Sequence, residues 1–211
     1  MIVEVERVAA TLRRERVLPL VALDDASVIP ELCAALLAGG VSCLEITFRT
    51  EEAIRAIERA AGIDGMLIGA GTVLTVEQAR AAAAAGARFA VAPGTDDAVV
   101  AECGELGIPF FPGIATPTEL GHALQLGRTV VKVFPASTLG GPAFLRAVSA
   151  TFPQAVFLPT GGIDGGSLAS YLAVPSVLAC GGSWICDQRS IRARDFAGIE
   201  RRARAARETA A

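Results

Sequence analysis

Short apolar runs recur along the whole chain at a nearly regular spacing, and this repeat constrains the fold more than any other feature. Eight such runs begin 20 to 26 residues apart. Between them lie segments of helical periodicity such as Glu51–Ala61, Val76–Ala85, Ala98–Leu106 and Pro117–Leu126. Because a helix makes each return crossing, the alternation predicts parallel strands. The runs are Val17–Leu23, Cys43–Phe48, Leu67–Val73, Phe89–Pro93, Pro109–Ala115, Val130–Phe134, Val156–Thr160 and Val177–Cys180.

Glycines mark the expected helix ends. Each stands shortly before an apolar run, where a left-handed C-cap residue is needed. The runs themselves are apolar almost throughout, as expected of strands that are buried on both faces. The glycines are Gly39-Gly40, Gly86, Gly107 and Gly127.

These patterns predict an α/β fold, a (β/α)8 TIM barrel that forms one compact domain over residues 1–211. The chain is 52% hydrophobic and 19% charged, and no linker or charge block divides it. An extra N-terminal helix, Val3–Arg14, would precede the first strand and close the bottom of the barrel. A doubly wound open sheet is the structural alternative.

Composition also limits location and partners. No apolar run is long enough to cross a bilayer, and the acidic N-terminus does not resemble a signal peptide, so we expect a cytoplasmic protein. The net charge of −3 comes from interspersed signs, which argues against nucleic acid as a partner. The five cysteines form no Cys-x-x-Cys pair, which favours reduced core thiols. The single histidine, His122, has no second ligand type at a useful spacing, so we expect no metal.

Lys132 is the single lysine among 19 basic residues. In the run Val130–Phe134 it should point to the same side as Phe134. Burial disfavours the ammonium form of a lysine, so an inward lysine offers a neutral amine that attacks carbonyl groups. Arginine cannot do this because it stays protonated. An ion-paired or snorkelling lysine at a strand end is the alternative.

The second run continues to Arg49, and its alternation sends Glu45, Thr47 and Arg49 to one side. A carboxylate inside a barrel is costly to bury without a partner or a function. The pattern therefore predicts either a site or a structural Glu45–Arg49 ion pair.

Glycine pairs follow the seventh and eighth runs, at Gly161-Gly162 and Gly181-Gly182. Backbone N–H groups exposed at such pairs bind anions, and barrels most often bind phosphate after these two strands. The sequence therefore predicts a phosphate subsite there, with Ser183 adding a hydroxyl.

Five stretches resemble the bacterial 2-keto-3-deoxy-6-phosphogluconate (KDPG) and 4-hydroxy-2-oxoglutarate (KHG) aldolases. The resemblance spans nearly the whole chain, and Val133 departs from the Leu or Phe that is usual in that family. It implies a homotrimer of barrels that acts on a small phosphorylated 2-keto acid and needs no metal or cofactor. The stretches are Gly40–Arg49, Gly69–Val73, Gly127–Gly140, Pro159–Ile163 and Gly181–Trp184.

The resemblance also implies roles for individual residues. Lys132 forms the Schiff base and Glu45 moves protons. Arg49, Thr72 and Thr160 hold the pyruvate carboxylate. The remaining positions are Phe134 beside the pyruvyl group, Pro93 lining the site, and Gly161, Gly162, Gly182 and Ser183 around the phosphate.

Three rival functions stay open at this point. A 2-keto-3-deoxy-6-phosphogalactonate aldolase uses the same chemistry on the opposite C4 configuration. A barrel isomerase or epimerase only shifts protons and has no need of an inward lysine beside Arg49. A pyridoxal-phosphate carrier would use Lys132 as its anchor.

Overall fold

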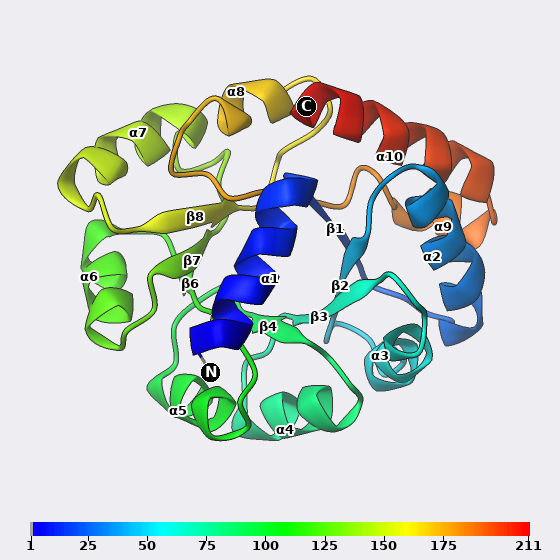
Figure 1. The fold of residues 1–211 in the computed structure, drawn as a ribbon, viewed down its shortest axis with the longest axis horizontal. Helices are drawn as coiled ribbons and strands as arrows, with labels where there is room; N and C mark the ends of the chain where they lie inside the picture. The colour runs from blue at the N-terminus through cyan, green and yellow to red at the C-terminus, as the bar shows by residue number, and fades with distance from the viewer. Residues whose placement is uncertain (1) are drawn as a thin grey trace.

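Parallel strands alternate with helices along the chain, and the strands curl into a ring that the helices surround (Figure 1). The computed structural model describes residues 2–211. The strands are β1 (Val17–Val21), β2 (Cys43–Thr47), β3 (Leu67–Gly71), β4 (Phe89–Val91), β5 (Phe110–Phe111), β6 (Gly113–Ile114), β7 (Val130–Val133), β8 (Val156–Pro159) and β9 (Cys180–Gly182). The helices are α1 (Ile2–Glu15), α2 (Ile29–Ala38), α3 (Ala53–Ala61), α4 (Val76–Ala84), α5 (Asp97–Glu105), α6 (Pro117–Gln125), α7 (Gly141–Thr151), α8 (Leu168–Leu172), α9 (Gln188–Arg192) and α10 (Phe196–Ala210), with a 3-10 turn η1 (Ala26–Val28).

The strands form a curled parallel sheet in two parts. One part has the order β5-β4-β3-β2-β1-β9 and the other the order β6-β7-β8. The expected run Pro109–Ala115 is divided at Pro112, so that β5 pairs with β4 and β6 pairs with β7. Proline has no N–H to give to a ladder, which explains the break. An isolated bridge between Thr160 and Gly181 brings the other ends of the two parts together.

The last strand lies later in the chain than the sequence predicted. We expected Val177–Cys180, but β9 is Cys180–Gly182, and Val177 makes an isolated bridge to Phe157. The expectation that Gly181-Gly182 follows the strand is therefore wrong. Parallel pairing with Leu18 and Pro19 of β1 continues through both glycines.

The glycine caps are confirmed at four of the five predicted positions. Gly40, Gly86, Gly107 and Gly127 have φ of 80°, 92°, 70° and 73°, which is the left-handed region. Gly39 instead has φ of −80°. Its lack of a side chain serves close packing, because a Cβ there would lie 2.8 Å from the carbonyl oxygen of Glu200 in α10.

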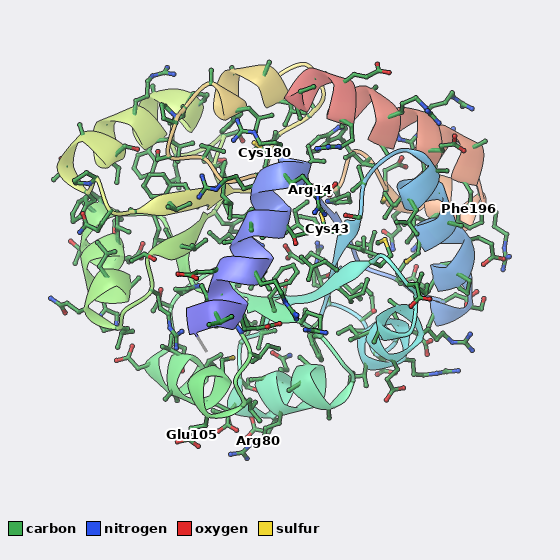
Figure 2. All side chains as sticks on the ribbon, in the orientation of Figure 1. Arg14, Cys43, Arg80, Glu105, Cys180 and Phe196 are labelled. Atoms are coloured by element: carbon green, nitrogen blue, oxygen red, sulfur yellow. The ribbon has the colours of Figure 1, made fainter. Side chains whose placement is uncertain are left out.

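Helix α1 crosses the ring at the end where the strands begin (Figure 1). Its buried carboxylate, Glu15, accepts hydrogen bonds from the backbone N–H and the hydroxyl of Ser42, just before β2. Arg14 donates to the same carboxylate, and Arg207 of α10 donates to the carbonyl oxygens of Arg14 and Glu15. Figure 2 shows Arg14 at this end of the ring, beside the start of β2 at Cys43. These bonds fix α1 across the bottom of the ring.

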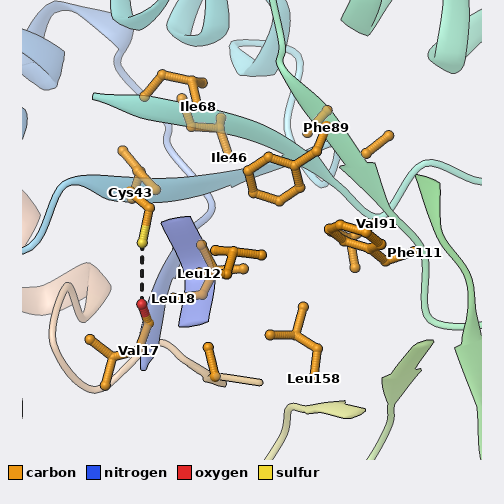
Figure 3. Close-up of a cluster of buried hydrophobic side chains, with 14 of the residues drawn as sticks. Leu12, Val17, Leu18, Cys43, Ile46, Ile68, Phe89, Val91, Phe111 and Leu158 are labelled. Atoms are coloured by element: carbon orange, nitrogen blue, oxygen red, sulfur yellow. Dashed lines mark hydrogen bonds between the residues drawn. The ribbon is translucent and has the colours of Figure 1, made fainter. Parts of the chain in front are cut away.

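The interior between α1 and the opposite end is a packed core. Leu12 of α1 lies among strand side chains that include Leu18, Phe89 and Leu158 (Figure 3). The rings of Phe89 and Phe111 have centroids 5.8 Å apart. The interior of the ring at this end is thus filled, which leaves the end where the strands finish for a site.

The five cysteines are buried and free, as expected of core thiols. The Cys43 thiol donates to the carbonyl oxygen of Val17 (Figure 3). Burial raises the pKa of Cys33 to about 12 and that of Cys103 to about 11. These thiols therefore stay protonated near neutral pH and act as apolar packing groups. Across residues 2–211, no helix combines the length and apolar character that a membrane span requires.

Candidate active site

A cavity of about 410 Å³ opens where the strands end. All eleven residues that the sequence singled out as site residues line it, and they come from six of the strands or the turns after them. Leu20, Thr47 and Ile163 complete the lining. The predicted residues are Glu45, Arg49, Thr72, Pro93, Lys132, Phe134, Thr160, Gly161, Gly162, Gly182 and Ser183.

Lys132 and Glu45 form an ion pair at the base of the cavity. The Lys132 Nζ lies 3.2 Å from the Glu45 Oε1, and the two side chains are 6% and 0% exposed. The partner of Glu45 is therefore Lys132 of β7, and the structural Glu45–Arg49 pair is not the arrangement that the fold adopts. The pair places an amine and a carboxylate within proton-transfer distance in a site shielded from water.

One carboxylate oxygen of Glu45 accepts a hydrogen bond from Lys132, and the other accepts none from the described residues. Its Oε2 is buried and receives no hydrogen bond from the described part of the chain. Gly71 of β3 provides the room, because a methyl group at that position would overlap the carboxylate. A buried acceptor without a donor costs about 1–3 kcal/mol. A ligand that donates a hydrogen bond to the Glu45 Oε2 would therefore bind more tightly.

Two polar side chains stand at the rim beside this pair. Arg49 is exposed on the turn after β2, where its N–H donates to the carbonyl oxygen of Thr47. Thr72 follows β3 with φ of 57°, a left-handed conformation. For a β-branched residue such a φ is a true outlier, and it costs about 1–3 kcal/mol. The strain is tolerated where the Thr72 side chain faces the cavity.

We expect Thr72→Gly to separate stability from activity. Glycine relieves the left-handed strain, whereas alanine keeps it, so Thr72→Gly should unfold at a free energy about 1 kcal/mol higher than Thr72→Ala. Both variants lose the hydroxyl, so both should lose activity, by about tenfold or more if the hydroxyl bonds a charged group. Urea denaturation and a steady-state activity assay measure the two effects. Thr72→Ser is the control, and a glycine variant less stable than the alanine variant would contradict the strain.

The aromatic wall of the cavity is Phe134, which is 39% exposed. The Lys132 Nζ lies 5.8 Å from the centre of its ring, so the two side chains share one side of the chain as their alternation predicted. A Cβ at Gly161 would lie 3.2 Å from the ring. The glycine thus leaves room for the ring beside the lysine.

Two backbone segments meet at the other end of the cavity. Gly161 and Gly162, after β8, have left-handed φ of 99° and 71°. Gly182 ends β9 and is followed by the exposed Ser183. The Thr160–Gly181 bridge brings these segments side by side. Their N–H groups and the Ser183 hydroxyl offer several donors to an anion.

The sequence analysis left three lining residues out of the predicted site. Thr47 could have been included, since it alternates with Glu45 and Arg49; its hydroxyl donates to the carbonyl oxygen of Val21 at 2.9 Å. Leu20 is the strand partner of Glu45, a pairing that no local pattern reveals. Ile163 directly follows Gly162 and is an apolar residue without a chemical signature.

Comparisons with known proteins agree with the geometry. Residues 8–202 match the family model described as KDPG and KHG aldolase. The 2-dehydro-3-deoxy-phosphogluconate aldolase of Treponema pallidum is 49% identical, over 89% of this chain and 90% of that protein.

Two solved structures have nearly the same fold. The KDPG aldolase of Legionella pneumophila, solved with pyruvate captured as a covalent carbinolamine, has a TM-score of 0.91 at 38% identity, over 94% of this chain and 97% of that one. The aldolase of Zymomonas mobilis ZM4, solved with 3-phosphoglycerate, has a TM-score of 0.89 at 34% identity, over 93% of each chain. The resemblance predicted from the sequence is confirmed, and the chain belongs to the KDPG and KHG aldolase family.

Proposed function

We propose that this protein is a class I aldolase, a carbon-carbon lyase that cleaves 2-keto-3-deoxy-6-phosphogluconate to pyruvate and glyceraldehyde 3-phosphate. Cleavage of 4-hydroxy-2-oxoglutarate to pyruvate and glyoxylate is the second activity. The observation that carries the proposal is the buried Lys132, paired with Glu45 at 3.2 Å inside the cavity. The covalent pyruvate adduct of the Legionella relative supports the same chemistry.

The first chemical step is imine formation. Glu45 takes the ammonium proton of Lys132, the resulting neutral amine adds to the C2 ketone, and the carbinolamine loses water to give a protonated imine. Glu45, at 3.2 Å, is near enough to take up and return the protons of these steps. The imine is an electron sink for the bond that breaks next.

Cleavage follows when Glu45, directly or through a water, removes the proton of the C4 hydroxyl. The C3–C4 bond breaks, its electron pair moves into the imine to form an enamine, and glyceraldehyde 3-phosphate leaves. Protonation at C3 and hydrolysis then free pyruvate and restore Lys132.

The remaining cavity residues position the substrate. Arg49, Thr72 and Thr160 hold the carboxylate, which fixes the ketone over Lys132 and lowers the barrier through orientation. Phe134 packs beside the pyruvyl group, and Pro93 lines the cavity. The phosphate binds to Gly161, Gly162, Gly182 and Ser183, in line with the 3-phosphoglycerate bound to the Zymomonas relative.

The wider assembly belongs to the same proposal. Counting β5 and β6 as one strand gives a closed eight-stranded barrel that forms a single domain over residues 1–211, with α1 across its bottom. A cytoplasmic homotrimer without metal or cofactor, within the Entner-Doudoroff route of carbohydrate metabolism, follows from the family resemblance. Family membership favours the aldolase over the barrel isomerase and the pyridoxal-phosphate carrier.

Trapping with borohydride tests the function directly. Incubation with pyruvate and borohydride should add one reduced pyruvyl group, located at Lys132 by peptide mass spectrometry. Labelling at the N-terminus alone, or no labelling, would contradict the Schiff-base mechanism at Lys132. A coupled assay that compares the gluconate and galactonate 6-phosphate epimers for pyruvate release identifies the substrate, and a visible absorbance band in the purified protein would point to the pyridoxal-phosphate carrier.

The phosphate subsite predicts a selective loss in Ser183→Glu. The new carboxylate opposes the phosphate at close range, so kcat/KM for the phosphorylated substrate should fall at least about 10²-fold. Cleavage of 4-hydroxy-2-oxoglutarate should fall much less, because Lys132, Glu45 and Arg49 are untouched.

Ser183→Gln is the matched control, since it has the same size and no charge. It should cost far less on the phosphorylated substrate. Equal losses on both substrates, in a Ser183→Glu variant that circular dichroism finds folded, would mean that the phosphate binds elsewhere.

A further inference from the structure

Trp184 carries the one side chain of the Gly181–Trp184 stretch to which the proposed function gives no role. It is the single tryptophan of the chain. It follows Ser183 directly, two residues after β9 ends at Gly182, and its side chain is half-buried against the core. A large aromatic residue in this place either contributes only to core packing or also fixes the position of the neighbouring backbone.

The indole lies against the chain on one side of the anion subsite. A Cβ at Gly182 would overlap the six-membered ring, which shows that the ring occupies the space a side chain would need there. The residues after Trp184 are well anchored, because Ile185 and Cys186 are buried and Arg202 of α10 donates to the carbonyl oxygen of Ile185. The ring is therefore held from the β9 side.

The other edge of the indole reaches the loop between β8 and α8. Its Nε1 lies 3.9 Å from where a Cβ would stand on Gly165. This loop begins at Gly161 and Gly162, which line the cavity. At its far end, Asp164 accepts hydrogen bonds from the N–H and hydroxyl of Ser167. The indole thus lies between the end of β9 and the loop that begins at the two glycines.

The position of the indole matters because the anion subsite consists mostly of backbone N–H groups. N–H groups of Gly161 and Gly162 must converge with those of the Gly182 segment on one phosphate, and glycines have no side chains with which to hold their own positions. The Thr160–Gly181 bridge fixes the base of the two segments. Beyond that base, the indole packs over Gly182, and its Nε1 faces Gly165 of the loop.

We propose that Trp184 is a positioning residue for the anion subsite, which sets the spacing between the β8–α8 loop and the end of β9 so that both bind one phosphate. The proposal rests on the proposed function for the identity of the ligand. It assigns no chemical step to Trp184.

The test compares Trp184→Ala and Trp184→Phe, with inorganic phosphate as the probe. Isothermal calorimetry should give a phosphate affinity about tenfold weaker for Trp184→Ala, equivalent to about 1.4 kcal/mol. Trp184→Phe should lose less, because its ring still covers Gly182. KM for the phosphorylated substrate should rise in parallel, while kcat and kcat/KM on 4-hydroxy-2-oxoglutarate stay close to wild type. Gly165→Ala is the control, since its methyl group meets the indole at an ordinary contact distance and should change the affinity by less than about twofold.

Two results would overturn the proposal: an unchanged phosphate affinity in folded Trp184→Ala, or equal losses on phosphorylated and unphosphorylated substrates. Failure of the proposed function is a separate outcome, since it appears as wild-type protein that pyruvate and borohydride do not label. Phosphate binding that depends on Trp184 would support the positioning role even in that case. A wild-type protein that is labelled by pyruvate and borohydride but binds no phosphate would contradict this inference and still support the Schiff-base mechanism.

Discussion

Lys132→Arg is expected to abolish aldol cleavage while the protein stays folded. The guanidinium keeps a positive charge opposite Glu45 and has room in the cavity of about 410 Å³. It stays protonated and forms no imine, so turnover should fall by about 10⁴-fold or more, as when a catalytic nucleophile is removed. Pyruvate and borohydride should no longer add mass to the chain. The coupled pyruvate assay and intact-protein mass spectrometry measure both effects.

The ion pair allows a control that separates chemistry from folding. Lys132→Met removes the cation and leaves the Glu45 carboxylate buried without its partner, which should cost about 3–5 kcal/mol in the free energy of unfolding. The double variant Lys132→Met with Glu45→Gln removes both charges and should recover much of that loss in urea denaturation. Both variants should be inactive. Turnover by Lys132→Arg near the wild-type rate, or a pyruvyl label on another residue, would contradict the assignment of the nucleophile.

The sequence was informative where a regular pattern decides the structure. Parallel strands buried on both faces are apolar runs at a regular spacing, and the left-handed glycines before them mark the helix ends. The same period of two within a strand predicts that Glu45 and Lys132 point inward. Eleven predicted residues meet in one cavity because strand ends, which are far apart in sequence, converge in a curled sheet.

Contacts between residues that are far apart in the chain could not be predicted from local sequence patterns. Arg49 is the cation nearest to Glu45 in sequence, but the partner is Lys132, 87 residues away. The register of β9 depends on β1 at the other end of the chain, which moved the last strand onto Gly181-Gly182. The left-handed conformation of Thr72 likewise has no local cause, since threonine disfavours it. The first two features are set by contacts between strands that are far apart in sequence.

Glu45→Gln should keep imine formation and lose most turnover. The amide has nearly the shape of the carboxylate and its oxygen can still accept from Lys132, so pyruvate and borohydride should still label the variant, though more slowly, because Glu45 also moves the protons of imine formation. It cannot take up a proton from the C4 hydroxyl, so kcat should fall by about 10²-fold or more, as is typical when a general base is removed. Single-turnover trapping and steady-state assays separate the two steps. Normal turnover would remove the proton-transfer role from Glu45.

Two control variants test whether the loss of turnover in Glu45→Gln depends on the position of this carboxylate. Glu15→Gln changes a second buried carboxylate, which bonds Ser42 at the opposite end of the ring. It should lower the free energy of unfolding but leave the activity of the folded protein unchanged. Gly71→Ala keeps Glu45 and forces its carboxylate to move, because the added methyl group overlaps it. This variant should lose turnover in the same direction as Glu45→Gln. A folded Gly71→Ala protein with wild-type kcat would show that the exact place of the Glu45 carboxylate is not required, which would contradict its action as the general base.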